Sequence, residues 1–247
     1  MSTPYKKAAT ALKQATQGIA LTGAGVSVES GISDFRSADG IWSRFDPMEY
    51  ATLDAFLDHP DKVWDLWHTM GMEMASVSAN AGHVALAAME QRGVLQAVIT
   101  QNFDGLHGAA GSCRVIEYHG NARRMVCLAC GAHRPLELGK PGDGAPRCGC
   151  GEAMKPDVIL FGEMIPDKAA EEGERLARQC DVMLIVGTSA QVYPVAQLPY
   201  TAKERGAFII ECNMEPTDFT EQITDVFLQG PASETLSRLL EHLSEDD

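Results

Sequence analysis

The segment from residue 18 to residue 36, GIALTGAGVSVESGISDFR, holds the first residues whose types and spacing suggest chemistry. A short apolar run, Ile19 to Leu21, meets Gly23-Ala24-Gly25, as a buried strand does when it ends in a tight turn. Glycines there let a phosphate approach main-chain N–H groups, so the pattern indicates a nucleotide site. Val28 stands where a dinucleotide fingerprint has its third glycine, so a tight turn without a ligand remains an alternative.

Four cysteines form a second constellation. Cys127-x-x-Cys130 is followed by Cys148-x-Cys150, a paired spacing that presents thiolates to tetrahedral zinc. Four protein ligands leave no open position for water, so we predict one structural zinc ion. The second pair is one residue shorter than usual, which makes His133 the substitute ligand to consider. The other cysteines are expected to be buried small apolar residues: Cys113, Cys180 and Cys212.

Apolar runs that alternate with helical patterns must position these groups. The runs are Ile19 to Leu21, Val94 to Ile99, Val182 to Val186 and Phe208 to Ile210. Helical patterns cover residues 5–17, 60–79, 82–92, 167–179, 194–205 and 233–243. This alternation predicts an α/β fold with a doubly wound, mostly parallel, Rossmann-like sheet.

Small or polar residues follow all four predicted strands. They are Thr22 to Gly25, Thr100 to Asp104, Gly187 to Ser189 and Glu211 to Asn213. Ligands of such sheets bind beyond the carboxyl ends of the strands, so these residues are candidates for one shared site. Helix capping is an alternative for one or two of them.

Residues 120–156 interrupt the alternation with many glycines and prolines and little apolar periodicity. We therefore expect a small inserted domain that zinc, rather than a large core, holds together. The main domain would comprise residues 1–119 and 157–247, with part of 30–80 adding helices to the small domain.

Composition restricts the partners. The chain has 247 residues and a formal charge of −14, which disfavours direct nucleic-acid binding. It lacks an apolar run long enough to cross a bilayer and a secretory signal at its start, so we expect no membrane association and a cytoplasmic location. The odd number of cysteines, seven, favours reduced thiols over disulfides.

Seven segments, in order, give the chain a family resemblance. They are GAGVSVESGISDFRSADGIW, TQNFDGLHGAAGS, EYHGN, the four cysteines, KPDVILFGEMIP, VGTSAQVYP and ECNMEPT. Together they resemble the sirtuin family of NAD-dependent protein deacylases, in the form of a minimal bacterial or archaeal catalytic core. The resemblance implies a large NAD-binding domain, a small zinc domain, and a cleft that takes NAD and an acyl-lysine peptide. It implies lysine deacetylation, with transfer of the acyl group to ADP-ribose and release of nicotinamide.

Residue roles follow from the same resemblance. His119 corresponds to the general base, Phe35 would shield the reactive sugar carbon, and Asn102 and Asp104 would act beside the nicotinamide ribose. Cofactor contacts are implied for the same four residues and for Gly23, Ala24, Gly25, Ser30, Asp34, Arg36, Trp42, Gln101, Phe103, Gly187, Thr188, Ser189, Asn213, Met214, Glu215 and Ala232. Substrate contacts are implied for Val158, Phe161, Gly162, Glu163 and Val192.

Four departures bear on specificity. Phe103 replaces the family's usual isoleucine, which we interpret as core filling rather than a changed nicotinamide pocket. Gly108 replaces a frequent glutamine. Trp67 and Met70 stand where relatives that remove succinyl or malonyl groups carry tyrosine and arginine, so neutral acyl groups, acetyl first, are favoured.

Other functions remain open at this stage. A mono-ADP-ribosyl transferase would share nicotinamide cleavage but deliver the sugar to a protein side chain. A zinc-stabilised module that binds acyl-lysine or NAD metabolites without turnover would not need Asn102, Asp104 and His119 together. The missing third glycine disfavours a hydride-transferring dehydrogenase.

Overall fold

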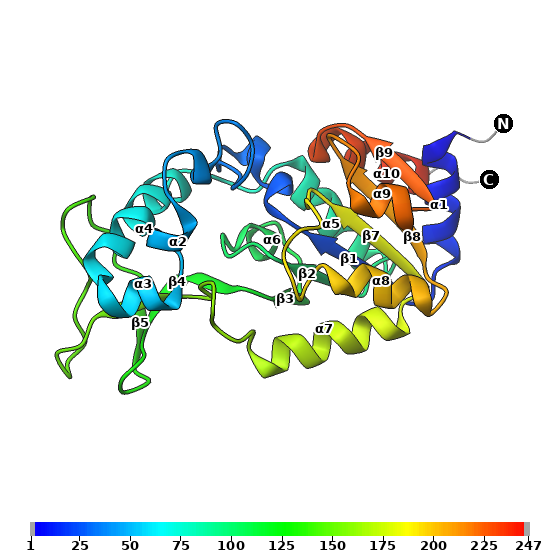
Figure 1. Ribbon diagram of the computed structural model, residues 1–247. Coiled ribbons are helices and arrows are strands. Elements are labelled where there is room, and N and C mark those ends of the chain that lie inside the picture. The colour runs from blue at the N-terminus through cyan, green and yellow to red at the C-terminus, as the bar shows by residue number, and fades with distance from the viewer. Residues whose placement is uncertain (1–2, 245–247) are drawn as a thin grey trace.

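A six-stranded sheet forms the larger part of the structure, a computed structural model that describes residues 3–244 (Figure 1). Every neighbouring pair of strands is parallel, and their order is β3-β2-β1-β7-β8-β9. From β1 the chain therefore extends the sheet in one direction and later returns to extend it in the other. The strands are β1 (Gly18–Thr22), β2 (Ala97–Thr100), β3 (Val115–Glu117), β7 (Val182–Val186), β8 (Phe208–Asn213) and β9 (Val226–Gln229).

Helices cover both faces of this sheet. One face packs on α1 (Pro4–Gln14), α5 (Ala81–Gln91) and α10 (Ala232–Ser244), and the other on α7 (Asp167–Gln179), α8 (Gln197–Glu204) and α9 (Asp218–Gln222). Alternate residues of a strand point to opposite faces, so Ala20 lies in the first core and Ile19 and Leu21 in the second. Burial on both faces explains why the strands read as continuous apolar runs.

A small antiparallel sheet lies apart from the large one, at the opposite end from the two chain termini (Figure 1). It consists of β4 (Gly120–Cys127), β5 (His133–Pro135) and β6 (Met154–Val158). It shares a core with α3 (Leu53–Asp58) and α4 (Pro60–Met74), beside α2 (Pro47–Tyr50). The indole of Trp64, fully buried, donates a hydrogen bond of 2.8 Å to the main-chain oxygen of Met154 and so joins α4 to β6.

The remaining elements are short. They are α6 (Leu106–Ala109) and the 3-10 turns η1 (Ala24–Val26), η2 (Val28–Ser30) and η3 (Ile41–Ser43). Within residues 3–244, no helix is both long and apolar enough to cross a membrane.

The predicted fold class is confirmed, while several boundaries differ. The strand expected from Val94 begins only at Ala97, because the N–H groups of Val94 and Leu95 still donate to Met89 at the end of α5. The helix expected over 60–79 ends at Met74. Strands β3 and β9, at the two edges of the sheet, were not expected.

Residues 120–156 contribute more core than their composition predicts. Met125, Cys127 and Met154 are fully buried against α4. The glycine- and proline-rich part of the segment is irregular, as expected, but β4 near the start of the segment pairs with β6 at its end. Packing therefore supports this segment together with its cysteines.

Candidate active site

A cavity of about 1130 Å³ opens at the carboxyl edge of the large sheet. Segments that follow β1, β2, β7 and β8 line one side of it, and residues 158–165 together with α4 line the other. The strand order turns at β1, and ligands of open α/β sheets bind at such a switch point. The four strand ends singled out in the sequence are thus brought together around one space.

The glycine turn after β1 packs directly against the end of β7. A Cβ on Gly25 would lie 2.7 Å from the Cα of Gly187, and one on Gly23 would lie 2.8 Å from the oxygen of Gly187. Gly187 has a φ of +59°, which favours glycine. The N–H of Gly25 donates to the oxygen of Gly187 at 2.9 Å. Close backbone contact is therefore a reason for these glycines that the sequence did not reveal.

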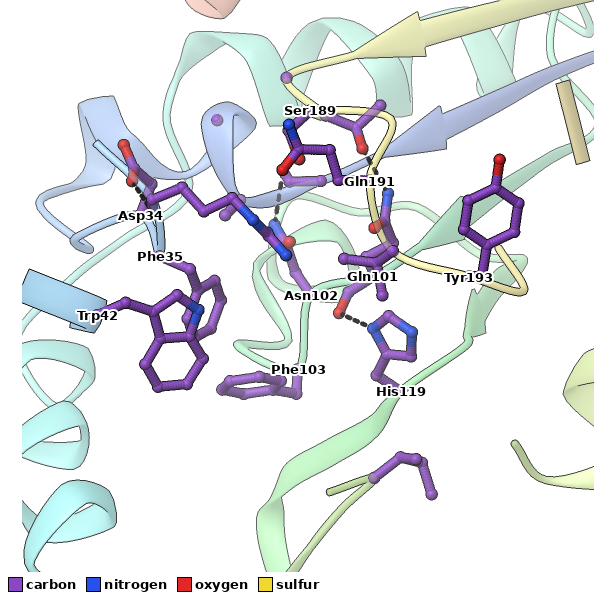
Figure 2. Close-up of a pocket in the computed structure, with 18 of the residues that line it drawn as sticks. Asp34, Phe35, Trp42, Gln101, Asn102, Phe103, His119, Ser189, Gln191 and Tyr193 are labelled. Atoms are coloured by element: carbon purple, nitrogen blue, oxygen red, sulfur yellow. Dashed lines mark hydrogen bonds between the residues drawn. The ribbon is translucent and has the colours of Figure 1, made fainter. Parts of the chain in front are cut away.

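The loop after this turn carries an aromatic cluster into the cavity. The carboxylate of Asp34 accepts 2.8 Å hydrogen bonds from the N–H groups of Arg36 and Ser37, which folds the loop back on itself. Phe35 then contacts Trp42, with ring centroids 5.1 Å apart, and Phe103, at 6.1 Å. Figure 2 shows these three rings gathered on one side of the cavity. An apolar wall of this kind excludes water from the space beside it.

His119 lies across the cavity from these rings (Figure 2). Its Nδ1 is 3.0 Å from the main-chain oxygen of Gln101, which can only accept a hydrogen bond. Nδ1 therefore carries the proton, and Nε2 of the neutral ring keeps its lone pair. Burial lowers the pKa of His119, and the bond to Gln101 opposes this to a smaller extent. The ring is thus a neutral base at physiological pH.

Asn102 heads a network of buried polar groups behind the cavity wall. Its amide donates to the oxygen of Gly23 at 3.2 Å and to Oγ of Ser27 at 3.1 Å. Ser27 in turn donates to the carboxylate of Asp104 at 2.7 Å. Asp104 does not line the cavity and is linked to Asn102 through Ser27, a residue that sequence reasoning missed.

Two histidines complete this network. His83 Nε2 lies 3.3 Å from Oγ of Ser27, and His107 Nε2 lies 2.8 Å from Oγ1 of Thr22. Burial lowers the pKa of both rings, and that of His107 to about 3. The two rings contact each other edge to face, with centroids 4.9 Å apart. They support the site from behind and stay neutral.

Side-chain amides join the neighbouring strand ends. Gln101 donates to Oγ1 of Thr188 at 2.8 Å, and Asn213 donates to the main-chain oxygen of Thr188 at 2.9 Å. These bonds link the ends of β2, β7 and β8 along the floor of the cavity. They fix the spacing of the groups that would contact a ligand.

Residues 158–163 form the opposite wall. The N–H of Ile159 donates to the oxygen of His119, and the N–H of Phe161 donates to the oxygen of Ala51, both at 2.9 Å. The side chain of Phe161 remains 44% exposed and that of Met164 85% exposed at the rim. This wall is extended up to Phe161 and turns at Gly162, and its apolar side chains at the rim are open to a partner.

A group of apolar residues from α4 closes the cavity beside Phe103. Trp67 and Met70 line it although they are 5% and 3% exposed, and Trp67 contacts Phe103 edge to face at 5.4 Å. Leu66 also lines this end. None of these side chains carries a positive charge that could pair with a carboxylate as arginine does.

The four cysteines predicted to bind metal lie together, with their sulfur atoms within 4.8 Å of one another. Sγ of Cys127 is 3.6 Å from that of Cys150, and Sγ of Cys130 is 3.6 Å from that of Cys148. Disulfide bonds are far shorter, at about 2.05 Å. Thiolates bound tetrahedrally to zinc at about 2.3 Å would be separated by about 3.8 Å. The donor set and its spacing fit one structural zinc ion.

The other metal and cysteine expectations give mixed results. His133 lies outside this cluster, 51% exposed, with Nδ1 3.8 Å from the carboxylate of Asp157. Cys180 and Cys212 are buried, as predicted, but Cys113 is exposed, so that prediction was wrong. Cys113 lies in the loop before the edge strand β3, where its N–H donates to the carboxylate of Glu90 on α5 while its side chain stays at the surface.

Most of the residues implied by the resemblance line the cavity. The exceptions are Ser30, Asp104 and Ala232. Ser30 instead accepts a hydrogen bond from the amide of Asn80 at 3.1 Å, and Ala232 is buried at the start of α10. Gln191 and Tyr193 line the cavity and were missed, although both lie in the quoted segment VGTSAQVYP (Figure 2).

The fold and the site together define a class of protein, a doubly wound α/β protein with a ligand cleft at its switch point and an attached four-cysteine module. A model of the Sir2 family matches residues 23–194. A protein of Pyrococcus furiosus named NAD-dependent protein deacylase is 43% identical over 238 residues, covering 94% of this chain and 95% of its own length. NAD-dependent protein deacetylase 1 of Pyrobaculum aerophilum is 46% identical over 228 residues, covering 91% and 89%.

Solved structures agree with these relatives. A Sir2 homologue in complex with NAD superimposes with a TM-score of 0.90 at 39% identity, covering 97% of this chain and 93% of that one. A Sir2 complex with a p53 peptide and NAD⁺ gives a TM-score of 0.88 at 32% identity, with 98% of both chains covered. This chain belongs to the Sir2 family, the sirtuins.

Proposed function

We propose that this protein is an NAD-dependent protein lysine deacylase that removes neutral acyl groups, with acetyl preferred. The relatives named above support this, because they are called NAD-dependent protein deacylases and deacetylases. The observation that carries the proposal is the neutral His119, whose Nε2 keeps its lone pair in a cavity that also holds Asn102 and the aromatic wall.

NAD, bound along the strand ends, would supply an electrophilic ribose carbon once its bond to nicotinamide breaks. The chain's own groups hold the two substrates. In this proposal Gly23 to Gly25 and Gly187 to Ser189 contact the phosphates and adenosine ribose, while Asn213 to Glu215 contact the adenine ribose. Gln101 and Asn102 orient the nicotinamide ribose and its carboxamide.

His119 would accept a proton from a ribose hydroxyl at Nε2, so that the sugar oxygen can attack the acyl group bound to the ribose through its amide oxygen. Phe35 would cover the electrophilic ribose carbon and exclude water from it. The lysine amine then leaves, and one water molecule adds to the remaining acyl-sugar, so that the products are nicotinamide, the free lysine side chain and O-acyl-ADP-ribose. The reaction is a transfer of the acyl group from lysine to ADP-ribose.

The acyl-lysine peptide would lie along residues 158–163 and pair with them as a strand. Val158, Phe161, Gly162 and Glu163 form this side in the proposal, and Val192 the other. Trp67, Met70 and Phe103 would surround the acyl group. Main-chain pairing gives affinity with little sequence preference, and the formal charge of −14 suits basic protein segments rather than nucleic acid.

The rest of the chain supports this assignment. We propose that Cys127, Cys130, Cys148 and Cys150 hold one zinc ion that stabilises the small sheet, and that residues 120–156 form the zinc insertion of a discontinuous NAD-binding domain, 1–119 and 157–247. We also propose a cytoplasmic location, because free thiolates persist where the surroundings are reducing.

A product assay tests the proposal. The purified protein is incubated with NAD and matched acetyl-, succinyl- and long-chain acyl-lysine peptides, and the products are identified by mass. We expect nicotinamide, deacetylated peptide and O-acetyl-ADP-ribose in equal amounts. A peptide that gains ADP-ribose would support a mono-ADP-ribosyl transferase instead, and binding without nicotinamide release would support a non-catalytic module.

A further inference from the structure

Lys155 is a charged side chain in the interior of the small sheet's module. It lies on β6 and is only 2% exposed. Its ammonium donates to the main-chain oxygen of Val158 at 2.6 Å and of Pro156 at 3.2 Å. It also lies 3.1 Å from the carboxylate of Glu163. The buried charge is therefore paired, and three oxygen atoms surround it.

Glu163 connects this ammonium to the far end of the same segment. Its carboxylate accepts a 2.7 Å hydrogen bond from the N–H of Leu160, and its own N–H donates to the oxygen of Leu160 at 3.0 Å. The side chain is 14% exposed. The Lys155 and Glu163 side chains thus hold the backbone at Val158 and Leu160, within the wall that faces the proposed peptide.

We infer that Lys155 and Glu163 are positioning residues for the acyl peptide, a role that rests on the proposed deacylase function. The pair sets the path of residues 158–163 between two fixed neighbours, His119 on one side and Ala51 on the other. Glu163 then affects peptide binding indirectly, because its ion pair with Lys155 and its hydrogen bond with Leu160 position the segment that the peptide contacts. Its carboxylate need not touch the peptide.

The choice of residue types supports positioning rather than stability alone. A buried ion pair is often no more stabilising than well-packed apolar residues of the same volume, because both charges lose their hydration. Apolar side chains, however, offer no hydrogen bond to the oxygen of Val158 or the N–H of Leu160. Polar groups thus contribute what packing cannot, a defined course for the backbone.

This difference gives a test with three variants. Lys155→Met removes the ammonium and leaves the carboxylate unpaired. Glu163→Gln keeps an acceptor for the N–H of Leu160 but removes the charge. The double variant Lys155→Met, Glu163→Leu removes both charges. For each, we would measure KM for an acetyl-lysine peptide, KM for NAD, and the midpoint of urea unfolding, with the zinc-loaded protein.

We expect Lys155→Met to raise the peptide KM about tenfold or more while the KM for NAD changes less than about twofold, since a small misplacement of a binding segment has large effects. Glu163→Gln is isosteric and should raise the peptide KM by a few-fold, and its urea midpoint should also fall, because the buried ammonium of Lys155 loses its charged partner. The double variant should recover the urea midpoint lost in Lys155→Met, since it leaves no unpaired charge, but keep a raised peptide KM.

Met125→Ala is the matched control, because this residue is fully buried on β4 in the same core and does not line the cavity. It should lower the urea midpoint without changing the peptide KM. A double variant with both midpoint and peptide KM restored would overturn the inference, as would equal rises in the KM for peptide and NAD. A wild-type protein without peptide-dependent nicotinamide release would instead refute the deacylase function itself.

Discussion

His119 and Gln101 are joined by a 3.0 Å hydrogen bond from the imidazole Nδ1 to the main-chain oxygen. The bond fixes the tautomer, because a carbonyl oxygen accepts and does not donate. It ties the proposed base to the loop that follows β2, next to Asn102. The same strand end therefore carries the groups that orient the ribose and the oxygen that orients the base.

His119→Ala should lower kcat about 10²- to 10⁴-fold, because a positioned general base contributes about that much. The fold should remain, since within residues 3–244 the imidazole forms a hydrogen bond only with Gln101. Initial rates and the circular dichroism spectrum check this. His59→Ala, an exposed histidine at the start of α4, is the control and should keep full activity. Near-normal turnover by His119→Ala would contradict the assignment.

Much of this site could be predicted from the sequence. Short apolar runs mark the parallel strands, and the polar residues that follow each run lie at the edge of the sheet where ligands bind. The clustering of the four cysteines could also be predicted, because a fixed spacing is sufficient to bring the ligands of one metal together. Ser27 and Lys155 were not predicted. Each is an ordinary residue in isolation and acquires its role only from partners distant in the chain, Asp104 and Glu163.

The edge strands of the large sheet and the exposure of Cys113 could not be predicted from the sequence either. β3 and β9 have only one neighbouring strand each, so a few apolar residues are sufficient to form them and the pattern is weak. Cysteine is a residue type that is usually buried, but the exposure of Cys113 depends on its position just before an edge strand.

Stability should fall as the pH decreases below about 6.5, partly because of His107. Burial lowers its pKa to about 3, whereas in the unfolded chain it titrates near 6.5. The unfolded state therefore binds a proton that the folded state does not, and stability is lost as pH falls through this window, by up to about 5 kcal/mol near pH 3. Urea unfolding between pH 7.5 and pH 4 measures it.

Carboxyl groups titrate in the same range, so the informative quantity is the difference between the wild type and a variant. His107→Gln keeps a hydrogen-bond partner for Thr22 and cannot take up a proton. It should lose less stability between pH 7 and pH 4 than the wild type does. Identical pH dependence in both proteins would show that His107 is not kept neutral by the fold.

Removal of zinc should unfold the small sheet and abolish activity through it. Cys127 and Cys148 are buried in the core shared with α4. Without zinc, no bond would hold their sulfur atoms together, and the core around them would loosen. Limited proteolysis after chelation should cut within 120–156, and Cys150→Ser should show the same cuts. Cys113→Ser, exposed and outside the cluster, is the control and should retain one zinc ion. Full activity without zinc would refute a required structural site.

Trp67→Tyr combined with Met70→Arg should shift the acyl preference toward succinyl. Both positions line the closed end of the cavity, where an arginine can pair with the acyl carboxylate. The ratio of kcat/KM for succinyl over acetyl peptide should rise about tenfold or more. Met72→Arg, exposed on the same helix and outside the cavity, should leave the ratio unchanged. An unchanged ratio in the double variant would place the acyl group elsewhere.

Phe103→Ile should reduce stability without changing nicotinamide inhibition. The ring contacts Phe35 and Trp67 edge to face, and loss of such aromatic contacts together with some buried volume costs about 1 to 2 kcal/mol. Denaturant unfolding measures this loss, and the inhibition constant for nicotinamide should stay within about twofold of the wild type. Phe45→Ile breaks a comparable contact, with Tyr50, outside the cavity. If inhibition changes in Phe103→Ile but not in Phe45→Ile, then the ring shapes the nicotinamide pocket and core filling is the wrong interpretation.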